Sequence, residues 1–195
     1  GHGNDHYVEF PDAAYGVTLG SNPEFDTTLL RFIYSSLVTP DSVYDYDITS
    51  RERTLLKRDD VLGGYDPSQY AVERLMAPAR DGVSIPISLV YRKPFVRDAK
   101  RPLLLYAYGS YGYTMEPTFG STRISLLDRG FVFAIAHIRG GQEMGRPWYD
   151  DGKMMKKMNT FFDFIDCAEH LVEERYATAG AMVAHGGSAG GLLMG

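Results

Sequence analysis

Ser188 lies at the centre of the run Gly186–Gly190, whose sequence Gly-Gly-Ser-Ala-Gly matches the pattern G-x-S-x-G. The apolar stretch Ala181–Gly186 leads into it and predicts a buried strand, and Gly191 begins a predicted helix. A sharp strand-to-helix turn holds a serine in a strained conformation and exposes its hydroxyl, and it needs small neighbours for space. Ser188 is therefore the candidate nucleophile. The backbone N–H of Ala189 is the candidate donor to the oxyanion that its attack would create.

A glycine-rich turn with a nucleotide-binding or packing role would give a similar local pattern. A phosphate-binding loop does not fit, because no Gly-Lys-Ser or Gly-Lys-Thr follows. The strand before the motif and the helix after it favour the nucleophile turn.

A serine nucleophile needs a base to accept its proton and a carboxylate to orient that base. In enzymes with this turn the chain order is serine, acid, histidine. No Asp, Glu or His follows Ser188, and all five histidines precede it: His2, His6, His137, His170 and His185. We interpret His185 as a packed strand residue and His137 as the end of another strand, so we expect the acid and the base beyond Gly195.

The elements before this turn fall into two parts, of which the first extends from Tyr7 to about Lys57. It predicts short strands, including Thr28–Ser35 and Ser42–Asp47, because β-branched and aromatic residues are frequent there. Closely spaced antiparallel strands are typical of a propeller blade or of the edge of a sandwich, and no internal repeat decides between them. Val61–Tyr70 contains Gly, Pro and Ser and is expected to be a linker.

The second part combines strands with helices. Tyr70–Met76 and Ser84–Tyr91 are predicted strands that flank Arg80–Gly82, where Asp-Gly is a hairpin signal. Two short apolar runs, Leu103–Tyr108 and Phe131–Ala136, predict buried strands.

An apolar stripe at three- and four-residue spacing predicts a helix over about Thr160–Arg175. Thr160 and Asp163 resemble a capping box at its start, although that motif prefers Glu or Gln in the second place. Because a strand, a helix and a strand follow one another, we expect a parallel α/β sheet with right-handed crossovers.

The composition limits the possible partners. A formal net charge of −5 argues against nucleic acid, since phosphate binding needs clustered Lys and Arg. Cys167 is the only cysteine, so no internal disulfide can form, and its place in a helical stretch predicts buried packing rather than catalysis. No run of 18 apolar residues predicts a membrane span.

The first residues, Gly1–Asp5, lack the basic and apolar regions of a signal peptide, so a cytoplasmic location is expected. They also lack an initiator Met, which suggests that the chain begins inside a longer protein.

Four segments, in this order and at this spacing, resemble the prolyl oligopeptidase family of serine peptidases: Leu105–Gly112, Ile138–Gly145, Trp148–Lys153 and Gly186–Gly191. The similarity covers nearly the whole chain and is firmest from about Tyr70 onward. Within the family, the sequence Tyr-Gly-Ser-Tyr that begins at Tyr108 is closer to the oligopeptidase B subfamily than to the prolyl-specific members, which have Tyr-Gly-Gly-Phe.

The resemblance implies roles for particular residues. Ser188 matches the family nucleophile, and Tyr108 matches a tyrosine whose hydroxyl completes the oxyanion hole with the N–H of Ala189. A phenol at the end of a buried strand can donate one hydrogen bond to such an oxyanion, although an aromatic at an interface would look the same. Glu116 falls where oligopeptidase B has an acid for a second basic residue of the substrate, whereas Thr118 replaces the next acid. An exposed loop carboxylate is the alternative for Glu116.

The resemblance implies an α/β fold: the first half of an α/β-hydrolase domain, over residues 71–195, preceded by the last part of a seven-bladed β-propeller and a linker, over residues 1–70. It implies a peptidase that cleaves short peptides after Arg or Lys without a metal or an organic cofactor. The acids that hold this Arg or Lys are expected beyond Gly195. The triad acid and histidine are expected there too, so the chain alone is expected to be inactive. Prolyl or acylaminoacyl specificity on the same fold, or a non-catalytic binding module, are the alternatives.

Overall fold

The first part of the chain forms a four-stranded antiparallel sheet in the computed structural model, which describes residues 5–195. The strands pair in chain order as β1 (Tyr15–Leu19), β2 (Leu29–Ser36), β3 (Ser42–Asp47) and β4 (Arg53–Arg58). Phe32, Tyr34 and Tyr46 form a small aromatic core. The predicted strands at residues 28–35 and 42–47 are confirmed.

The second part forms a five-stranded sheet in the order β5-β6-β8-β7-β9. Its strands are β5 (Tyr70–Pro78), β6 (Ser84–Arg92), β7 (Leu103–Tyr106), β8 (Val132–Ala136) and β9 (Met182–His185). The predicted hairpin is confirmed, because β5 and β6 pair antiparallel around Arg80–Gly82. The predicted parallel sheet is confirmed for β8, β7 and β9, whereas β6 pairs antiparallel with β8.

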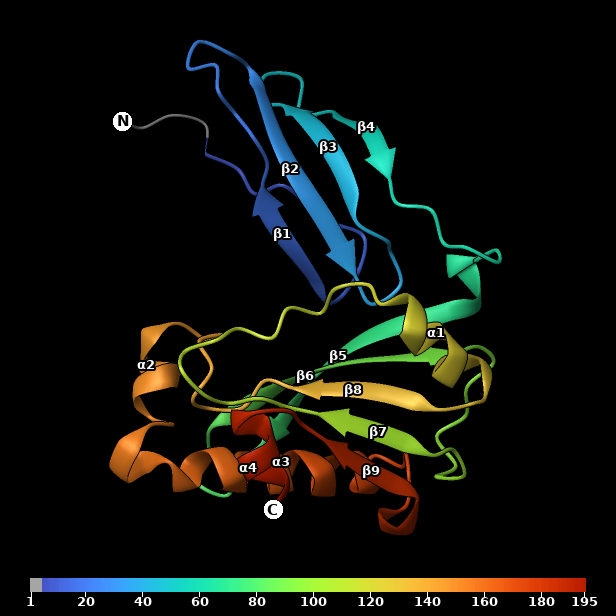
Figure 1. Cartoon of the computed structure of the whole chain (residues 1–195), viewed down its shortest axis with the longest axis vertical. Helices are drawn as coiled ribbons and strands as arrows, with labels where there is room; N and C mark the ends of the chain where they lie inside the picture. The colour runs from blue at the N-terminus through green and yellow to red at the C-terminus, as the bar shows by residue number, and fades with distance from the viewer. Residues whose placement is uncertain (1–4) are drawn as a thin grey trace.

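Helices lie on both faces of this sheet (Figure 1). They are α1 (Ser121–Asp128), α2 (Arg146–Asp150), α3 (Met158–Glu173) and α4 (Ala189–Met194), with short 3₁₀ turns η1 (Pro67–Gln69), η2 (Met154–Lys156) and η3 (Ala179–Ala181). On one face, Phe164 and Leu171 of α3 share a core with Leu89 of β6. On the other face, Leu127 of α1 packs with Val90, the next residue of β6, as the alternation of side chains along a strand requires.

Three local expectations were wrong. The capping box does not form, because α3 begins earlier, with Lys157 at its N-cap. The hydroxyl of Thr160 instead donates to the carbonyl oxygens of Arg139 and Gly152, at 2.7 and 3.1 Å. Strand β9 is not buried: Met182 is half-buried and the three residues after it are exposed. The reason is that β9 is an edge strand of its sheet among the described residues. His185 is exposed and its ring lies against Tyr106, so it is not the packed histidine that the sequence suggested.

The two sheets meet through the loop that follows β2. Leu37 and Val38 from this loop join the core on the α1 face of the second sheet. The N–H of Phe119 donates to the hydroxyl of Ser35 at 3.0 Å. Among residues 5–195, no helix has the length and apolar character needed to cross a membrane. The division of the chain at residue 70 stays a prediction.

Candidate active site

Ser188 occupies a strained turn between β9 and α4. Its φ of 53° and ψ of −120° lie in a region that residues with a side chain rarely adopt. The residue is exposed at the amino-terminal end of α4. This is the geometry of a nucleophile turn, in which backbone strain holds the serine hydroxyl outside the sheet.

The glycines of the motif are required by close backbone contacts. A Cβ on Gly186 would lie 2.5 Å from the carbonyl oxygen of Gly190. A Cβ on Gly190 would lie 2.8 Å from the carbonyl oxygen of Ala107, at the end of β7. The first and last positions of G-x-S-x-G therefore exclude any side chain, because the turn packs tightly on itself and on the neighbouring strand.

The two candidate oxyanion donors meet at the same sheet edge. Because β7 and β9 are parallel, with Tyr106 opposite His185, the residues that follow both strands emerge side by side. Tyr108 lies beside the turn: a Cβ on Gly190 would be 3.6 Å from Cδ2 of its ring. Ala189 is the first residue of α4, where a backbone N–H has no partner within the helix. The structure thus brings Tyr108 and Ala189 to Ser188.

The structure places Glu116 beside the first sheet. Its carboxylate is close to β1, since a Cβ on Gly16 would be 3.1 Å from Oε2 of Glu116 and 3.3 Å from Cγ2 of Thr118. Glu116 also lines a hollow of about 420 Å³ together with His185 and Arg123. Burial raises the pKa of Glu116, and nearby Glu143 adds to this rise, while His137 opposes it. No hydrogen bond within the described chain joins Glu116 to Ser188, Tyr108 or Ala189.

His137 is a buried side chain whose polar neighbours are Ser88 and Glu143. Its Nε2 forms a 2.7 Å hydrogen bond with the hydroxyl of Ser88, in a direction set by the ring tautomer. Its Nδ1 has no hydrogen-bond partner and lies 3.7 Å from Oε1 of Glu143. That same oxygen accepts the N–H of Met115 at 2.9 Å. His137 and Glu143 therefore support the loop that leads to Glu116.

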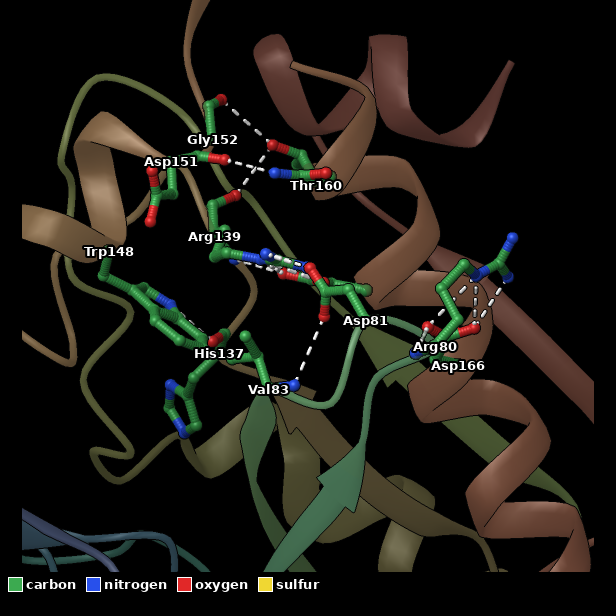
Figure 2. A network of polar contacts seen from close by, with 12 residues as sticks. Arg80, Asp81, Val83, His137, Arg139, Trp148, Asp151, Gly152, Thr160 and Asp166 are labelled. Atoms are coloured by element: carbon green, nitrogen blue, oxygen red, sulfur yellow. Dashed lines mark hydrogen bonds and ion pairs between the residues drawn. The ribbon is translucent and has the colours of Figure 1, made fainter. Parts of the chain in front are cut away.

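A partly buried ionic network joins the tip of the β5–β6 hairpin, Arg139 after β8, and α3 (Figure 2). The guanidinium of Arg139 donates to both oxygens of Asp163 in α3, and to Asp81 at the tip of the β5–β6 hairpin at 2.6 Å. These carboxylates raise the pKa of Arg139. The indole N–H of Trp148 donates to the carbonyl oxygen of His137 at 2.9 Å. The sequence did not predict this network, because its partners are separated by tens of residues and follow no local pattern.

Cys167 is fully buried in α3, as the sequence predicted, and burial raises the pKa of its thiol. Within residues 5–195, no group of three or more His, Cys, Asp or Glu side chains is arranged to hold a metal ion. Of the five histidines, His2 lies outside the described residues.

A sheet in this strand order, with a strained serine between a parallel strand and a helix, defines an α/β-hydrolase domain. Two family models match the chain. Residues 1–59 match the prolyl oligopeptidase N-terminal beta-propeller domain, and residues 117–195 match the prolyl oligopeptidase family. The chain belongs to the prolyl oligopeptidase family.

Several relatives are similar to nearly the whole chain. Dipeptidyl aminopeptidase BI of Pseudoxanthomonas mexicana is 55% identical over 99% of the chain, and Protease 2 of Moraxella lacunata is 43% identical over 96%. The chain spans 27% of the length of each. The solved structure of oligopeptidase B from Trypanosoma brucei with covalently bound antipain matches 96% of the chain and 27% of that protein, with 43% identity and a TM-score of 0.87. This chain thus combines the end of a propeller with the start of an α/β-hydrolase domain.

Proposed function

We propose that this chain is part of a serine oligopeptidase that cleaves short peptides after Arg or Lys. The observation that supports this most is the strained backbone of Ser188 beside Tyr108, with the N–H of Ala189 at the start of α4. The domain boundary near residue 70 and the contribution of the catalytic acid and histidine by a longer protein are parts of the same proposal.

In this mechanism, Oγ of Ser188 attacks the carbonyl carbon of the scissile bond while the histidine of the longer protein takes the hydroxyl proton. The carbonyl electron pair moves onto oxygen, where the N–H of Ala189 and the hydroxyl of Tyr108 donate hydrogen bonds to it. The C–N bond then breaks and the histidine returns its proton to the leaving amine. Water repeats the attack and releases Ser188.

The test is the hydrolysis of a fluorogenic Arg-Arg peptide by the full-length protein. Ser188→Ala should lower kcat by at least about 10³-fold, because the nucleophile is removed while the oxyanion donors remain. Ser125→Ala is the control, since Ser125 is exposed on α1. Unchanged activity in Ser188→Ala would refute the assignment of the nucleophile.

Specificity for basic residues is supported by the sequence after Tyr108, by Glu116 and by the similarity to an oligopeptidase B. The name of the 55% identical relative supports a second candidate, the release of dipeptides from a peptide amino terminus. Matched substrates with free and blocked amino termini distinguish these two functions. Prolyl and acetylated substrates in the same panel test the other specificities of the fold.

A non-catalytic binding module is the remaining alternative. A fluorophosphonate that reacts with activated serines should label the full-length protein at Ser188, and the absence of labelling would favour the binding module. We further propose a cytoplasmic location, which the single buried Cys167 supports, because reducing compartments keep thiols unpaired. Cell fractionation with an antibody against the protein tests it.

A further inference from the structure

Lys157 is a half-buried cation at the start of α3. A positive charge at this end does not stabilise a helix, so its presence needs another explanation. None of the ion pairs among residues 5–195 includes Lys157, and burial lowers the pKa of its ammonium. It stands at the N-cap of α3, where the helix dipole disfavours a positive charge. Partial burial of a charge without a counter-ion is unfavourable, so the hydrogen bonds of Lys157 must account for its position.

Those hydrogen bonds all go to the turn that follows Tyr108. The ammonium nitrogen donates to the carbonyl oxygen of Gly109 at 2.6 Å and to the hydroxyl of Ser110 at 2.8 Å. Gly109 and Ser110 are both buried, so water has little access to this carbonyl group. Bonds from a charged donor are stronger than neutral ones, and here one cation orients two consecutive residues.

The backbone of this turn can take few other positions. Gly109 has a φ of 65°, and a Cβ on it would lie 2.6 Å from Thr160 and 2.7 Å from Ile138. On the other side of the turn, a Cβ on Gly140 would lie 2.1 Å from the carbonyl oxygen of Gly109. The peptide group after Gly109 is therefore held between Gly140 and α3, and Lys157 fixes the direction of its carbonyl.

The orientation of this turn decides where the Tyr108 hydroxyl lies. On the other side of Tyr108, the N–H of Ala107 donates to the carbonyl oxygen of His185, the last residue of β9. A small backbone rotation at Tyr108 is enlarged at its hydroxyl, because the ring is long and rigid. An oxyanion donor acts only at the correct distance, and a displacement of about 1 Å can cost about 10²-fold in rate.

We propose that Lys157 is a positioning residue for Tyr108 and that it holds the phenol in the geometry that stabilises the oxyanion. This inference rests on the proposed peptidase function. Lys157 does not touch the substrate and acts through the carbonyl of Gly109 and the hydroxyl of Ser110. The effect belongs to the transition state, so it should change kcat and leave KM nearly unchanged.

The test is a double-mutant cycle in the full-length protein with Lys157→Met and Tyr108→Phe. Tyr108→Phe should lower kcat about 10²-fold, as the loss of one oxyanion donor does, and Lys157→Met about 10-fold. In the Tyr108→Phe background, Lys157→Met should lower kcat less than twofold, because the phenol hydroxyl that it positions is already absent. Lys157→Arg, which keeps the donors, should restore part of the rate.

Lys156→Met is the matched control, because Lys156 is the exposed neighbour that pairs with Asp151. If Lys157→Met lowers kcat equally in both backgrounds, or does not lower it at all, the inference is overturned. Should Lys157→Met not fold, Lys157→Gln replaces it in the cycle.

A second measurement does not depend on activity. With 3-fluorotyrosine at position 108, Lys157→Met should shift or broaden the ¹⁹F resonance, and Lys156→Met should not. An unchanged resonance overturns the inference even if the protein cleaves no peptide. If the wild-type protein hydrolysed no peptide, the proposed function would be refuted, but the inference about Lys157 would not.

Discussion

At the scale of single residues, Glu116 carries a charge that its surroundings oppose. Its carboxylate is partly buried beside Gly16, and Glu143 is a second acid nearby. Both effects raise the pKa of Glu116, and His137 offsets only part of the rise. A cationic side chain of a substrate would relieve this repulsion, which gives the carboxylate a reason to bind one.

The raised pKa predicts a pH dependence. Glu116 is ionised above its pKa and takes up a proton, as the pH falls, earlier than an ordinary glutamate does. The preference for Arg-Arg over Gly-Arg substrates should therefore decline as the pH falls, at a higher pH than an ordinary glutamate would cause. The ratio of the two kcat/KM values measures it, since the titration of the catalytic histidine cancels.

Glu116→Gln should lower this preference about fivefold at pH 7, as the loss of about 1 kcal/mol from a partly exposed ion pair implies. It should also remove the pH dependence of the ratio. A ratio that still varies with pH in the variant would assign the titration to another group.

The sequence predicted Ser188 because five consecutive residues define its turn. The strain at Ser188 and the contacts of Gly186 and Gly190 follow from that one motif. Lys157 could not be predicted, because it is 48 residues from Gly109 and a lysine at a helix start carries no local signal. Only the fold brings the two together.

At the scale of elements, the β5–β6 hairpin is fastened to α3 by ionic contacts. Asp81 at its tip binds Arg139, and Arg139 also binds Asp163 of α3. The neighbouring Arg80 binds Asp166, one turn further along the helix, at 2.6 Å. Arg139 directly precedes Gly140, whose backbone lies against the carbonyl oxygen of Gly109, and Thr160 of α3 lies beside Gly109 as well. The network therefore supports the backbone that surrounds the turn after Tyr108.

We expect Arg139→Met to destabilise the protein by about 3–5 kcal/mol, because it leaves the fully buried Asp163 as an unpaired charge. Arg146→Met is the control: Arg146 forms an exposed pair with Asp150, and its loss should change the free energy of unfolding by no more than about 0.5 kcal/mol. Urea unfolding of both variants and of the wild type measures the difference. Equal midpoints for Arg139→Met and Arg146→Met would contradict the prediction.

The elements themselves could be predicted to different degrees. Strands β7 and β8 were predicted because each is a short apolar run, and β6 was predicted from the Asp-Gly hairpin signal before it. Helix α1 was missed, since only Leu127 among its residues is buried and no apolar stripe marks it. The antiparallel pairing of β6 with β8 depends on contacts between distant segments, which the periodicity of one strand does not record.

At the scale of the whole molecule, the loop that carries Glu116 lies between the two sheets. Glu143 holds it from the hydrolase side through the N–H of Met115. Ser35 holds it from the first sheet by accepting the N–H of Phe119, and Gly16 of β1 leaves space for the carboxylate. The position of a candidate substrate-binding group thus depends on residues of the propeller part.

This dependence predicts the effect of Gly16→Val. The new side chain would meet the carboxylate of Glu116 and the methyl group of Thr118, while valine itself suits a strand, so β1 should persist and Glu116 should move. We expect kcat/KM for Arg-Arg substrates to fall about fivefold with Gly-Arg substrates unaffected, because Ser188 and Tyr108 keep their places. Val17→Ile, which adds bulk on the exposed face of the same strand, should change neither. An equal loss for both substrates would mean that Gly16→Val disturbs the whole site, and no loss would mean that the first sheet does not position Glu116.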